Sequence, residues 1–551
     1  MTDPTPPGTA FAAVAEAWRI IRQACDGEAD RLRRLCLDPE AVQRQFLAKL
    51  VEANARSRFG IEHGFAAIHS YDDYAKAVPI QPYAAFRPYI ERAIEGASGE
   101  LTSEPILFAE LTGGSTGGSK IIPYTRSALR GYSRAVVPWM AGLLEQWPRV
   151  AGGRAYFALS PMGRSGDERI GVVPLGSPEQ FDYFGDCGDS IAAVSVAPHA
   201  LAALTDIADW QFATCLHLLA ARDLSLIWIW SPTFLVELLH VMQRRKTELV
   251  EALGRGAGTA APAPAPQPER AKELTALLGE DRIDTARIWP DLTVISCWMD
   301  ASSAPFAAML QEAFPNVAFQ AKGLMATEGA TTLPFGSGQG SPLALESGFF
   351  EFADEHWRTK PAWELEQGEV RRLILSNHCG LYRYDTEDLV EVVGFEGATP
   401  RLSFVGRAGQ STDLCGEKLA EPFVLRCLEH ALAPHGGYAF LAPATRPRPH
   451  YALWLDGSFA DADIARLAGA VDEALHENPQ YAYARRLGQL DPVEGHASED
   501  LFEKYRAWAS TKGKTIGMMK AAALLSGIPE DLVEALRATG AASAGEADRR
   551  D

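Results

Sequence analysis

Short apolar runs of five to seven residues recur along the middle of the chain, separated by glycine-rich turns and by segments with helical spacing. Runs of this length are typical of buried strands. After the run at 224–230, Ser231 can cap a helix whose first residue is Pro232. Strands that alternate with helices predict a layered α/β domain. The runs are ILFAEL (106–111), RAYFAL (154–159), LSLIWIW (224–230), LTVISCW (292–298) and VAFQA (317–321).

The segments on either side of this region have a different pattern. The first hundred residues predict helices, and Pro39–Ala55 places Val42, Phe46, Leu50 and Val51 on one helical face. Residues 347–405 contain strand-like runs between tight turns, which predict an antiparallel sheet or a small β-barrel.

A polar, turn-rich link near Gly406–Gly416 is the expected main domain boundary. It divides the chain into an N-terminal domain (1–408) and a smaller α+β C-terminal domain (409–551). In the C-terminal domain, we expect helices at Asp461–Glu477 and Ser498–Ala509 and a disordered tail over the last residues, 538–551. Residues 254–270 are rich in alternating Ala and Pro, which excludes a helix or a central strand. We expect them to form an exposed insertion within the N-terminal domain.

Composition and charge limit the classes of function. The 551 residues are 47% hydrophobic and 22% charged, which excludes a mainly disordered chain. The formal net charge of −19 argues against a broad nucleic-acid or anionic membrane surface. The eight cysteines contain no CxxC pair, so neither a zinc ribbon nor a redox dithiol is indicated. With no secretory signal visible and the apolar window 224–242 interrupted by Pro232 and Glu237, we expect a cytoplasmic enzyme.

The segment 111–124, LTGGSTGGSKIIPY, carries the strongest chemical signal. Glycines let the backbone approach a phosphate, and amides and hydroxyls can donate to its oxygens. A Walker loop is disfavoured because Ser119 stands where lysine is required. The GxSxG pattern would make Ser115 the nucleophile of a hydrolase, but that motif requires a helix directly after the serine. The third interpretation is a glycine–hydroxyl loop between two strands that wraps a triphosphate.

Two further motifs follow in order along the chain. Thr327 and Glu328, in GLMATEG, come after an apolar strand, where ligands collect in open α/β sheets. Asp388 ends the segment YRYDTED. Taken alone, the Thr-Glu pair could be a helix cap and Asp388 a turn residue, so it is their order behind the glycine-rich loop that favours a nucleotide site.

The three segments resemble the motifs of AMP-forming adenylating enzymes, whose pattern (T)SGTTGxPK aligns onto Thr112–Lys120 and whose YRxGD motif corresponds to YRYDTED. The N-terminal text 38–92 and the segments GLYRYDTEDLVEVVGF, GEKLAE and TKGKTIGMMKAAALL resemble one branch, the Gretchen Hagen (auxin-responsive promoter) family of acyl-acid amido synthetases. The similarity covers roughly residues 35–530. It implies a large adenylate-forming domain of layered α/β sheets plus a small β-barrel, followed by a smaller, mobile α+β domain.

The resemblance also implies an activity and a set of site residues. Family members use ATP and Mg²⁺ to adenylate a carboxylic acid, and then transfer the acyl group to the amine of an amino acid. Glu328 would hold magnesium, Asp388 would bind the ribose, and Lys520 would act at the carboxylate–phosphate junction. Arg407 corresponds to the hinge arginine, and Lys418 is a further candidate for a nucleotide contact. The residues expected around the phosphates are Gly114, Ser115, Thr116, Gly117, Lys120 and Thr327.

Three positions depart from the family pattern: Leu324 replaces an aromatic residue, Glu387 replaces glycine, and Met519 replaces glutamine. The alternatives that remain open are an acyl-CoA ligase of the same superfamily, a serine hydrolase that uses Ser115, and a non-catalytic nucleotide-binding relative. We expect a monomer or a weak homodimer whose partners are small acid and amino acid substrates.

Overall fold

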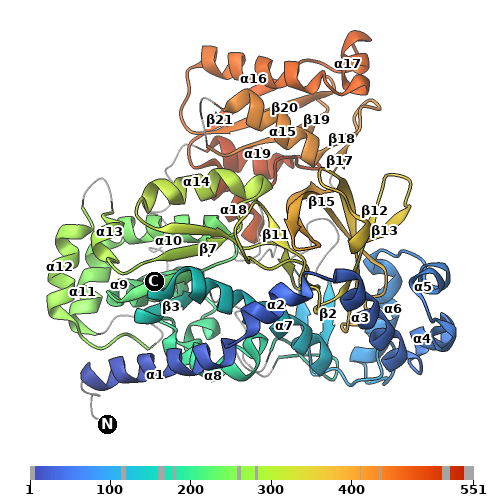
Figure 1. Cartoon of the computed structure of the whole chain (residues 1–551). Coiled ribbons are helices and arrows are strands. Elements are labelled where there is room, and N and C mark those ends of the chain that lie inside the picture. Colours follow the sequence, from blue (N-terminus) through green and yellow to red (C-terminus); the bar gives the residue numbers. More distant parts are fainter. Residues whose placement is uncertain are drawn as a thin grey trace, which may run out of the picture. The chain divides into compact units, whose positions relative to one another are not determined.

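The computed structural model describes residues 7–112, 120–158, 168–177, 181–256, 262–279, 283–409, 411–433, 435, 437–511 and 521–538. The chain forms two compact units (Figure 1). Unit 1 comprises Met1–Asp300 and Ala307–Val405, and unit 2 comprises Ala301–Phe306 and Gly406–Asp551. No helix in the described residues is both long and apolar enough to cross a membrane.

Unit 1 begins with the expected helices. Asp38 caps α3 by accepting a hydrogen bond from the backbone N–H of Ala41 at 3.1 Å. Leu50 and Val51 on this helix are buried in a core shared with Phe349 and Phe352 of the antiparallel sheet, beside which α3 lies in Figure 1. The helices are α1 Pro7–Cys25, α2 Glu28–Leu35, α3 Pro39–Asn54, α4 Arg58–Glu62, α5 Tyr71–Ala77 and α6 Tyr83–Ile94.

A sheet of four parallel strands forms the centre of unit 1, in the order β3-β6-β7-β8. One face, with Trp228 and Val294, packs against α1 and α7, and the opposite face, with Ile227 and Ile295, packs against α9 and α10. The layered α/β domain expected from the apolar runs is therefore confirmed. The strands are β3 Arg154–Phe157, β6 Leu224–Trp228, β7 Val294–Cys297 and β8 Ala318–Ala321.

Some of the helices around this sheet begin at a residue whose side chain caps the helix. Thr125 caps α7 by accepting a hydrogen bond from the backbone N–H of Ala128 at 3.1 Å. Ser231 precedes Pro232 at the start of α10, but its hydroxyl bonds to Thr233 Oγ1 instead of a backbone amide. The helices are α7 Arg126–Gln146, α8 Gly188–Val194, α9 Ile207–Ala220, α10 Pro232–Arg244, α11 Lys246–Arg255, α12 Pro268–Leu277, α13 Thr285–Ile288 and α14 Ala304–Ala313.

Six strands of unit 1 form an antiparallel sheet in the order β11-β16-β15-β14-β12-β13, which is one of the two forms predicted from residues 347–405. These strands are β11 Ser341–Pro342, β12 Phe349–Ala353, β13 Thr359–Pro361, β14 Val370–Ser376, β15 Tyr384–Glu396 and β16 Thr399–Arg407. Three short hairpins complete the strands: β1 Phe108–Leu111 with β2 Ile121–Tyr124, β4 Arg169–Ile170 with β5 Val173–Pro174, and β9 Met325–Ala326 with β10 Gly329–Ala330.

Unit 2 is the smaller α+β part, with a sheet in the order β19-β20-β21. The helices expected at 461–477 and 498–509 are α16 and α18 with shifted ends. Its elements are β17 Ser411–Thr412, β18 Leu419–Ala420, α15 Glu421–Leu432, β19 Ala439–Ala444, β20 His450–Asp456, α16 Asp461–Leu475, α17 Pro479–Arg486, β21 Glu494–Ser498, α18 Leu501–Thr511 and α19 Glu530–Arg537. Short 3-10 helices lie at Phe65–Ala67, Pro148–Gly152, Asp182–Cys187, His199–Ala203, Ala301–Ser303 and Ala362–Glu364.

Candidate active site

The glycine-rich motif connects the two strands of the β1–β2 hairpin. Leu111 pairs with Ile121, and the N–H of Thr112 donates to the carbonyl of Lys120 at 2.9 Å. The described chain resumes at Lys120, directly before β2 (Ile121–Tyr124), and the next helix begins only at Arg126. This geometry favours the loop between two strands over a nucleophile elbow. The candidate phosphate ligands of the loop, Gly114, Ser115, Thr116 and Gly117, lie outside the described residues.

Lys120, Tyr384 and Glu328 form a connected polar group inside unit 1. The Nζ of Lys120 donates to the Tyr384 hydroxyl at 2.8 Å and lies 3.7 Å from Oε1 of Glu328. The Tyr384 hydroxyl in turn donates to the same Glu328 oxygen at 3.2 Å. Because the side chains of Lys120 and Glu328 remain 22% and 13% exposed, both charges are held in place yet accessible to a ligand.

Tyr83 of α6 fixes the backbone next to Lys120. Its hydroxyl donates to the carbonyl of Ile121 at 2.9 Å and accepts from the N–H of Ile121 at 2.8 Å. The ammonium of Lys120 also lies 5.8 Å from the centre of the Tyr83 ring and 5.5 Å from that of Tyr384. Aromatic rings at such distances attract a cation, so Lys120 is oriented by both tyrosines.

Thr327 and Glu328 form the turn of the β9–β10 hairpin, and two side chains donate hydrogen bonds to their backbone carbonyls. The Tyr124 hydroxyl donates to the Thr327 carbonyl at 2.6 Å, and the amide of Asn377 donates to the Glu328 carbonyl at 2.5 Å. Burial raises the pKa of Tyr124, which keeps its phenol protonated as a donor. These bonds leave the side chains of Thr327 and Glu328 to act at the surface of the site.

Asp388 lies on an irregular stretch of β15. The register between β14 and β15 shifts between Arg372 and Ile374, so that residues 386–388 bulge out of the ladder. Glu387 occupies the left-handed region with φ of 66°, and the N–H of Asp388 donates to Thr386 Oγ1 at 3.1 Å. Bulges commonly redirect a side chain beside an active site. The bulge accounts for the position of Asp388, which the sequence indicated only through its motif.

The residues before the bulge are anchored by two ion pairs. Arg372 donates to both carboxylate oxygens of Asp385, at 2.6 and 2.5 Å. The buried Arg383 donates to Glu351, a residue with no exposed surface, and to the carbonyls of Ala75 and Val78. The segment that carries Tyr384 and Asp388 is therefore fixed to both β12 and the helical region.

The remaining predicted residues belong to unit 2 or lie outside the description. Arg407 ends β16, immediately after the division between the units at Val405 and Gly406. Lys418 is exposed and has φ of 46°, next to Glu417, whose buried carboxylate accepts from the N–H groups of Leu414 and Cys415. Lys520 lies outside the described residues, so its role stays a prediction.

Sequence reasoning missed the tyrosines of the site. Tyr384 stands inside the YRYDTED segment, but nothing in that pattern distinguishes a tyrosine that packs in a core from one that bonds a lysine. Tyr83 and Tyr124 lie on other elements, α6 and β2, and no motif marks them.

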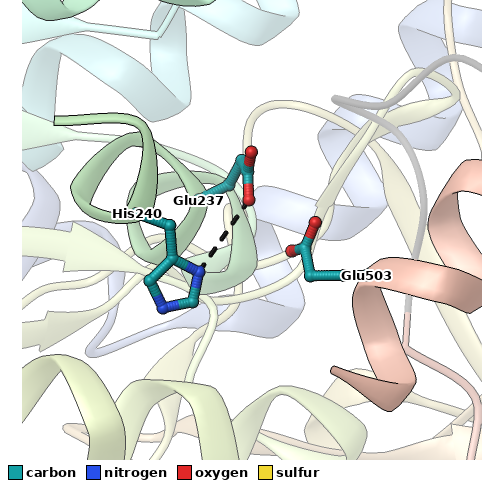
Figure 2. A group of neighbouring side chains, drawn as sticks. All are labelled: Glu237, His240 and Glu503. Carbon is teal, nitrogen blue, oxygen red and sulfur yellow. Dashed lines mark ion pairs between the residues drawn. The ribbon is translucent and has the colours of Figure 1, made fainter. Parts of the chain in front are cut away.

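A second group of ionisable side chains lies on α10, away from these motifs in the sequence. Figure 2 shows the ion pair between Nδ1 of His240 and Oε2 of Glu237, at 3.9 Å. Glu237 also pairs with Arg244 at 3.0 Å and accepts from Gln211 at 3.3 Å. Glu503, also drawn in Figure 2, belongs to unit 2 and pairs with Arg506 on its own helix. Both acids therefore take part in the charge networks of their own units.

The fold belongs to the adenylate-forming class. The structure matches that of an acyl acid amido synthetase, GH3.15 in complex with 2,4-DB, with a TM-score of 0.82 and 16% identity, over 97% of each chain. It also matches a 2-hydroxyisobutyryl-CoA ligase in the postadenylation state, with a TM-score of 0.50 and 12% identity, over 92% of this chain and 90% of that one. At such low identity these matches establish the fold alone.

The family follows from the sequence. Residues 28–319 match the GH3 family N-terminal domain, and residues 341–407 match the GH3 family central domain. The chain therefore belongs to the GH3 family, the Gretchen Hagen family that its motifs resemble. It is similar to a jasmonoyl–L-amino acid synthetase of Oryza sativa subsp. japonica, with 22% identity over 86% of this chain and 89% of the relative. It is also similar to an indole-3-acetic acid-amido synthetase of Arabidopsis thaliana, with 23% identity over 82% of this chain and 87% of the relative.

Proposed function

We propose that the protein is an ATP-dependent acyl-acid amido synthetase. In the first step, a carboxylate oxygen of the acid attacks the α-phosphorus of ATP, the bond to pyrophosphate breaks, and an acyl-adenylate forms. In the second step, the amine of an amino acid attacks the acyl carbon, loses a proton, and displaces AMP. Two relatives are named a jasmonoyl–L-amino acid synthetase and an indole-3-acetic acid-amido synthetase. These names support a small carboxylic acid and an amino acid as the substrates.

The observation that carries the proposal is the Lys120–Tyr384–Glu328 group. It brings together the end of the glycine-rich loop, the Thr-Glu hairpin and the start of the strand that carries Asp388. These are the three motifs expected of an adenylating enzyme, and they lie far apart in the sequence. A serine hydrolase has no need for a lysine and an acid at these positions.

Within this mechanism, positioning and charge neutralisation do most of the work. Lys120, with Gly114, Ser115, Thr116 and Gly117, would neutralise and orient the phosphates. The Thr327 hydroxyl would donate a hydrogen bond to an oxygen of the α-phosphate, because the negative charge around this phosphate is redistributed as the carboxylate attacks and pyrophosphate leaves. Asp388 would accept hydrogen bonds from the ribose hydroxyls.

Magnesium fits the group of donors found here. Mg²⁺ prefers oxygen ligands and commonly binds one or two carboxylates together with substrate phosphates. Glu328 is a partly exposed carboxylate beside the expected phosphate position and would hold the ion. When bound, the metal would supply further neutralisation of the triphosphate charge.

Unit 2 would complete the site by moving between the two steps. The hinge would lie near Arg407–Gly416, with Lys418 as a further contact to the nucleotide. Lys520 would reach the carboxylate–phosphate junction only during adenylation. Lys520→Ala should then slow adenylation about a hundredfold to a thousandfold while largely sparing amide formation from supplied acyl-adenylate. Lys512 and Lys514 are the other candidates for this role, and measuring both half-reactions for all three alanine variants decides among them.

The test is carboxylate-dependent exchange between ATP and pyrophosphate across a panel of aliphatic, aromatic and indole acids. Active acids are then offered amino acids and CoA, and products are identified by mass spectrometry. Amide products support the proposal. Thioester products alone would make the protein an acyl-CoA ligase, and ester hydrolysis that depends on Ser115, without exchange, would refute both assignments.

A further inference from the structure

Lys322 occupies an unusual place at the end of the parallel sheet. It follows β8 directly, and its N–H donates to the Cys297 carbonyl of β7 at 2.9 Å, which continues the ladder by one residue. Its side chain has no exposed surface. In open α/β sheets, ligands bind at this carboxyl end of the strands.

Two indole rings surround its amine. The Nζ of Lys322 lies 3.3 Å from the ring centre of Trp228 and 4.6 Å from that of Trp230. The rings of Trp230 and Trp298, at the same edge, are 5.9 Å apart and partly exposed. The amine is therefore packed against aromatic rings, and Trp230 and Trp298 extend this aromatic cluster to the surface of unit 1.

Neither this amine nor a nearby hydroxyl has a hydrogen-bond partner among the described residues. Lys322 Nζ and Ser296 Oγ are both buried and unpartnered. Ser296 is aligned with Trp228 and Gln320 across the sheet, and Lys322 lies two residues beyond Gln320, on the same face. Buried polar groups are almost always bonded, so two unsatisfied groups on one face need an explanation.

A ligand supplies that explanation better than a structural role does. Burial lowers the pKa of the Lys322 ammonium well below its ordinary value, because the charged form loses its hydration. A methionine of similar length would pack between the same rings without this penalty. An acceptor from a bound molecule would satisfy both the amine and the serine hydroxyl.

We propose that Lys322 selects the acyl substrate: its amine binds a hydrogen-bond acceptor at the far end of the acid, and Trp228 and Trp230 pack against the apolar body. This inference rests on the proposed function and names the acid class as carboxylic acids with a second carboxylate, carbonyl or hydroxyl group on the tail. Aromatic and apolar walls with few placed polar groups are typical of small-molecule sites.

The distance along the chain fits an acid of modest size. Five residue steps separate Lys322 from Thr327, where the reacting carboxylate must meet the α-phosphate. A fully extended chain of that length spans at most about 17 Å. Because the chain turns at Gly323, with φ of 73°, the actual separation is shorter and can be bridged by one small acid.

The first test compares matched pairs of acids that differ only in a tail carboxylate, carbonyl or hydroxyl, using pyrophosphate exchange by the full-length protein. Wild type should favour the substituted member, and Lys322→Met should reduce that preference about tenfold to a hundredfold while preserving activity on the unsubstituted acid. Lys49→Met, at an exposed site, is the control. An equal loss for all acids, or no change, would overturn the proposal.

The second test does not depend on activity. The acid pairs are titrated by calorimetry without ATP, and thermal unfolding of both proteins is recorded. Lys322→Met should bind the substituted acids more weakly and should unfold at a higher temperature, because an unpartnered amine is removed. A lower unfolding temperature would show that Lys322 supports the fold and would refute the proposal. If no acid drives exchange but binding still depends on Lys322, the proposed function fails and the ligand site stands.

Discussion

The Nζ of Lys120 lies 2.8 Å from the hydroxyl of Tyr384, and that hydroxyl lies 3.2 Å from Glu328. The two charged residues are 3.7 Å apart at their nearest atoms, so the phenol bridges them. The tyrosine thereby keeps the cation beside the loop where phosphates are expected and prevents Lys120 from collapsing fully onto the acid.

Tyr384→Phe tests this bridge. Loss of the hydroxyl should let Lys120 and Glu328 pair directly, which withdraws the ammonium from ATP. A hydrogen bond to a charged group contributes ~1.5–3 kcal/mol, so kcat/KM for ATP in pyrophosphate exchange should fall about tenfold to a hundredfold. The control is Tyr382→Phe, which removes a buried bond to the Leu101 carbonyl. That variant should lose stability but keep its kinetics, and equal kinetic losses would contradict the assignment.

Asp388→Ala tests the nucleotide end of the site. Removal of a carboxylate that accepts from the ribose should weaken ATP binding by ~1.5–3 kcal/mol, about tenfold to a hundredfold in Kd. Calorimetric titration with ATP and with inorganic triphosphate separates the effects, because triphosphate lacks the ribose and should bind both proteins alike. Unchanged ATP affinity would remove Asp388 from the site.

The sequence predicts the strands and the motifs well because both depend on local patterns. The apolar runs at 224–230 and 292–298 became β6 and β7, and the order of the Thr-Glu and Asp motifs indicated adenylation before any geometry was known. The partners of Lys120 could not be predicted in this way. Tyr83 and Tyr384 are 301 positions apart, and only the packing of α6 against the sheet brings them to one lysine.

The backbone conformation of Glu387 also could not be predicted from the sequence. The loss of the family's glycine at 387 suggests a backbone that no longer needs it, yet Glu387 keeps a left-handed conformation with φ of 66°. The bonds from Glu387 N–H to Asp385 and from Asp388 N–H to Thr386 Oγ1 impose this conformation. Both bonds join residues two positions apart within YRYDTED, yet the pattern of residue types alone does not indicate which backbone conformation they support.

Substitutions at Glu387 should reveal the stored strain. A side chain in the left-handed region costs ~1–2 kcal/mol, and the greater freedom of glycine in the unfolded chain offsets ~0.5–1 kcal/mol. Glu387→Gly should therefore increase the free energy of unfolding by up to about 1.5 kcal/mol relative to Glu387→Ala, in which a Cβ remains. Urea unfolding followed by tryptophan fluorescence measures the difference. A less stable glycine variant would show that the residue is not strained.

The buried ion pair of Arg383 and Glu351 should behave as one unit. Glu351 has no exposed surface, so Arg383→Met would leave an unpaired charge in the core and cost ~3–5 kcal/mol of stability. The double variant Arg383→Met with Glu351→Met should be more stable than the Arg383→Met single variant, because no lone charge remains. A double-mutant cycle from urea unfolding measures the coupling, and strictly additive losses would contradict it.

Lys322→Met makes the pH dependence of stability testable. Burial lowers the folded-state pKa of this lysine well below its unfolded value near 10.5, so between the two pKa values the unfolded chain binds a proton that the folded chain lacks. In the wild type, the loss of free energy of unfolding caused by the depressed pKa of Lys322 is therefore absent above the unfolded-state pKa. This loss grows as the pH falls, by at most about 1.4 kcal/mol per pH unit. The stabilising effect of Lys322→Met should be large at pH 7 and shrink toward pH 10. Cation–π attraction to the indole rings does not cancel this effect, because it contributes only ~2 kcal/mol, whereas burying an ion costs several kcal/mol. Urea unfolding at four pH values measures the trend, and a gain that does not vary between pH 7 and 10 would mean that the Lys322 amine is charged in the folded protein.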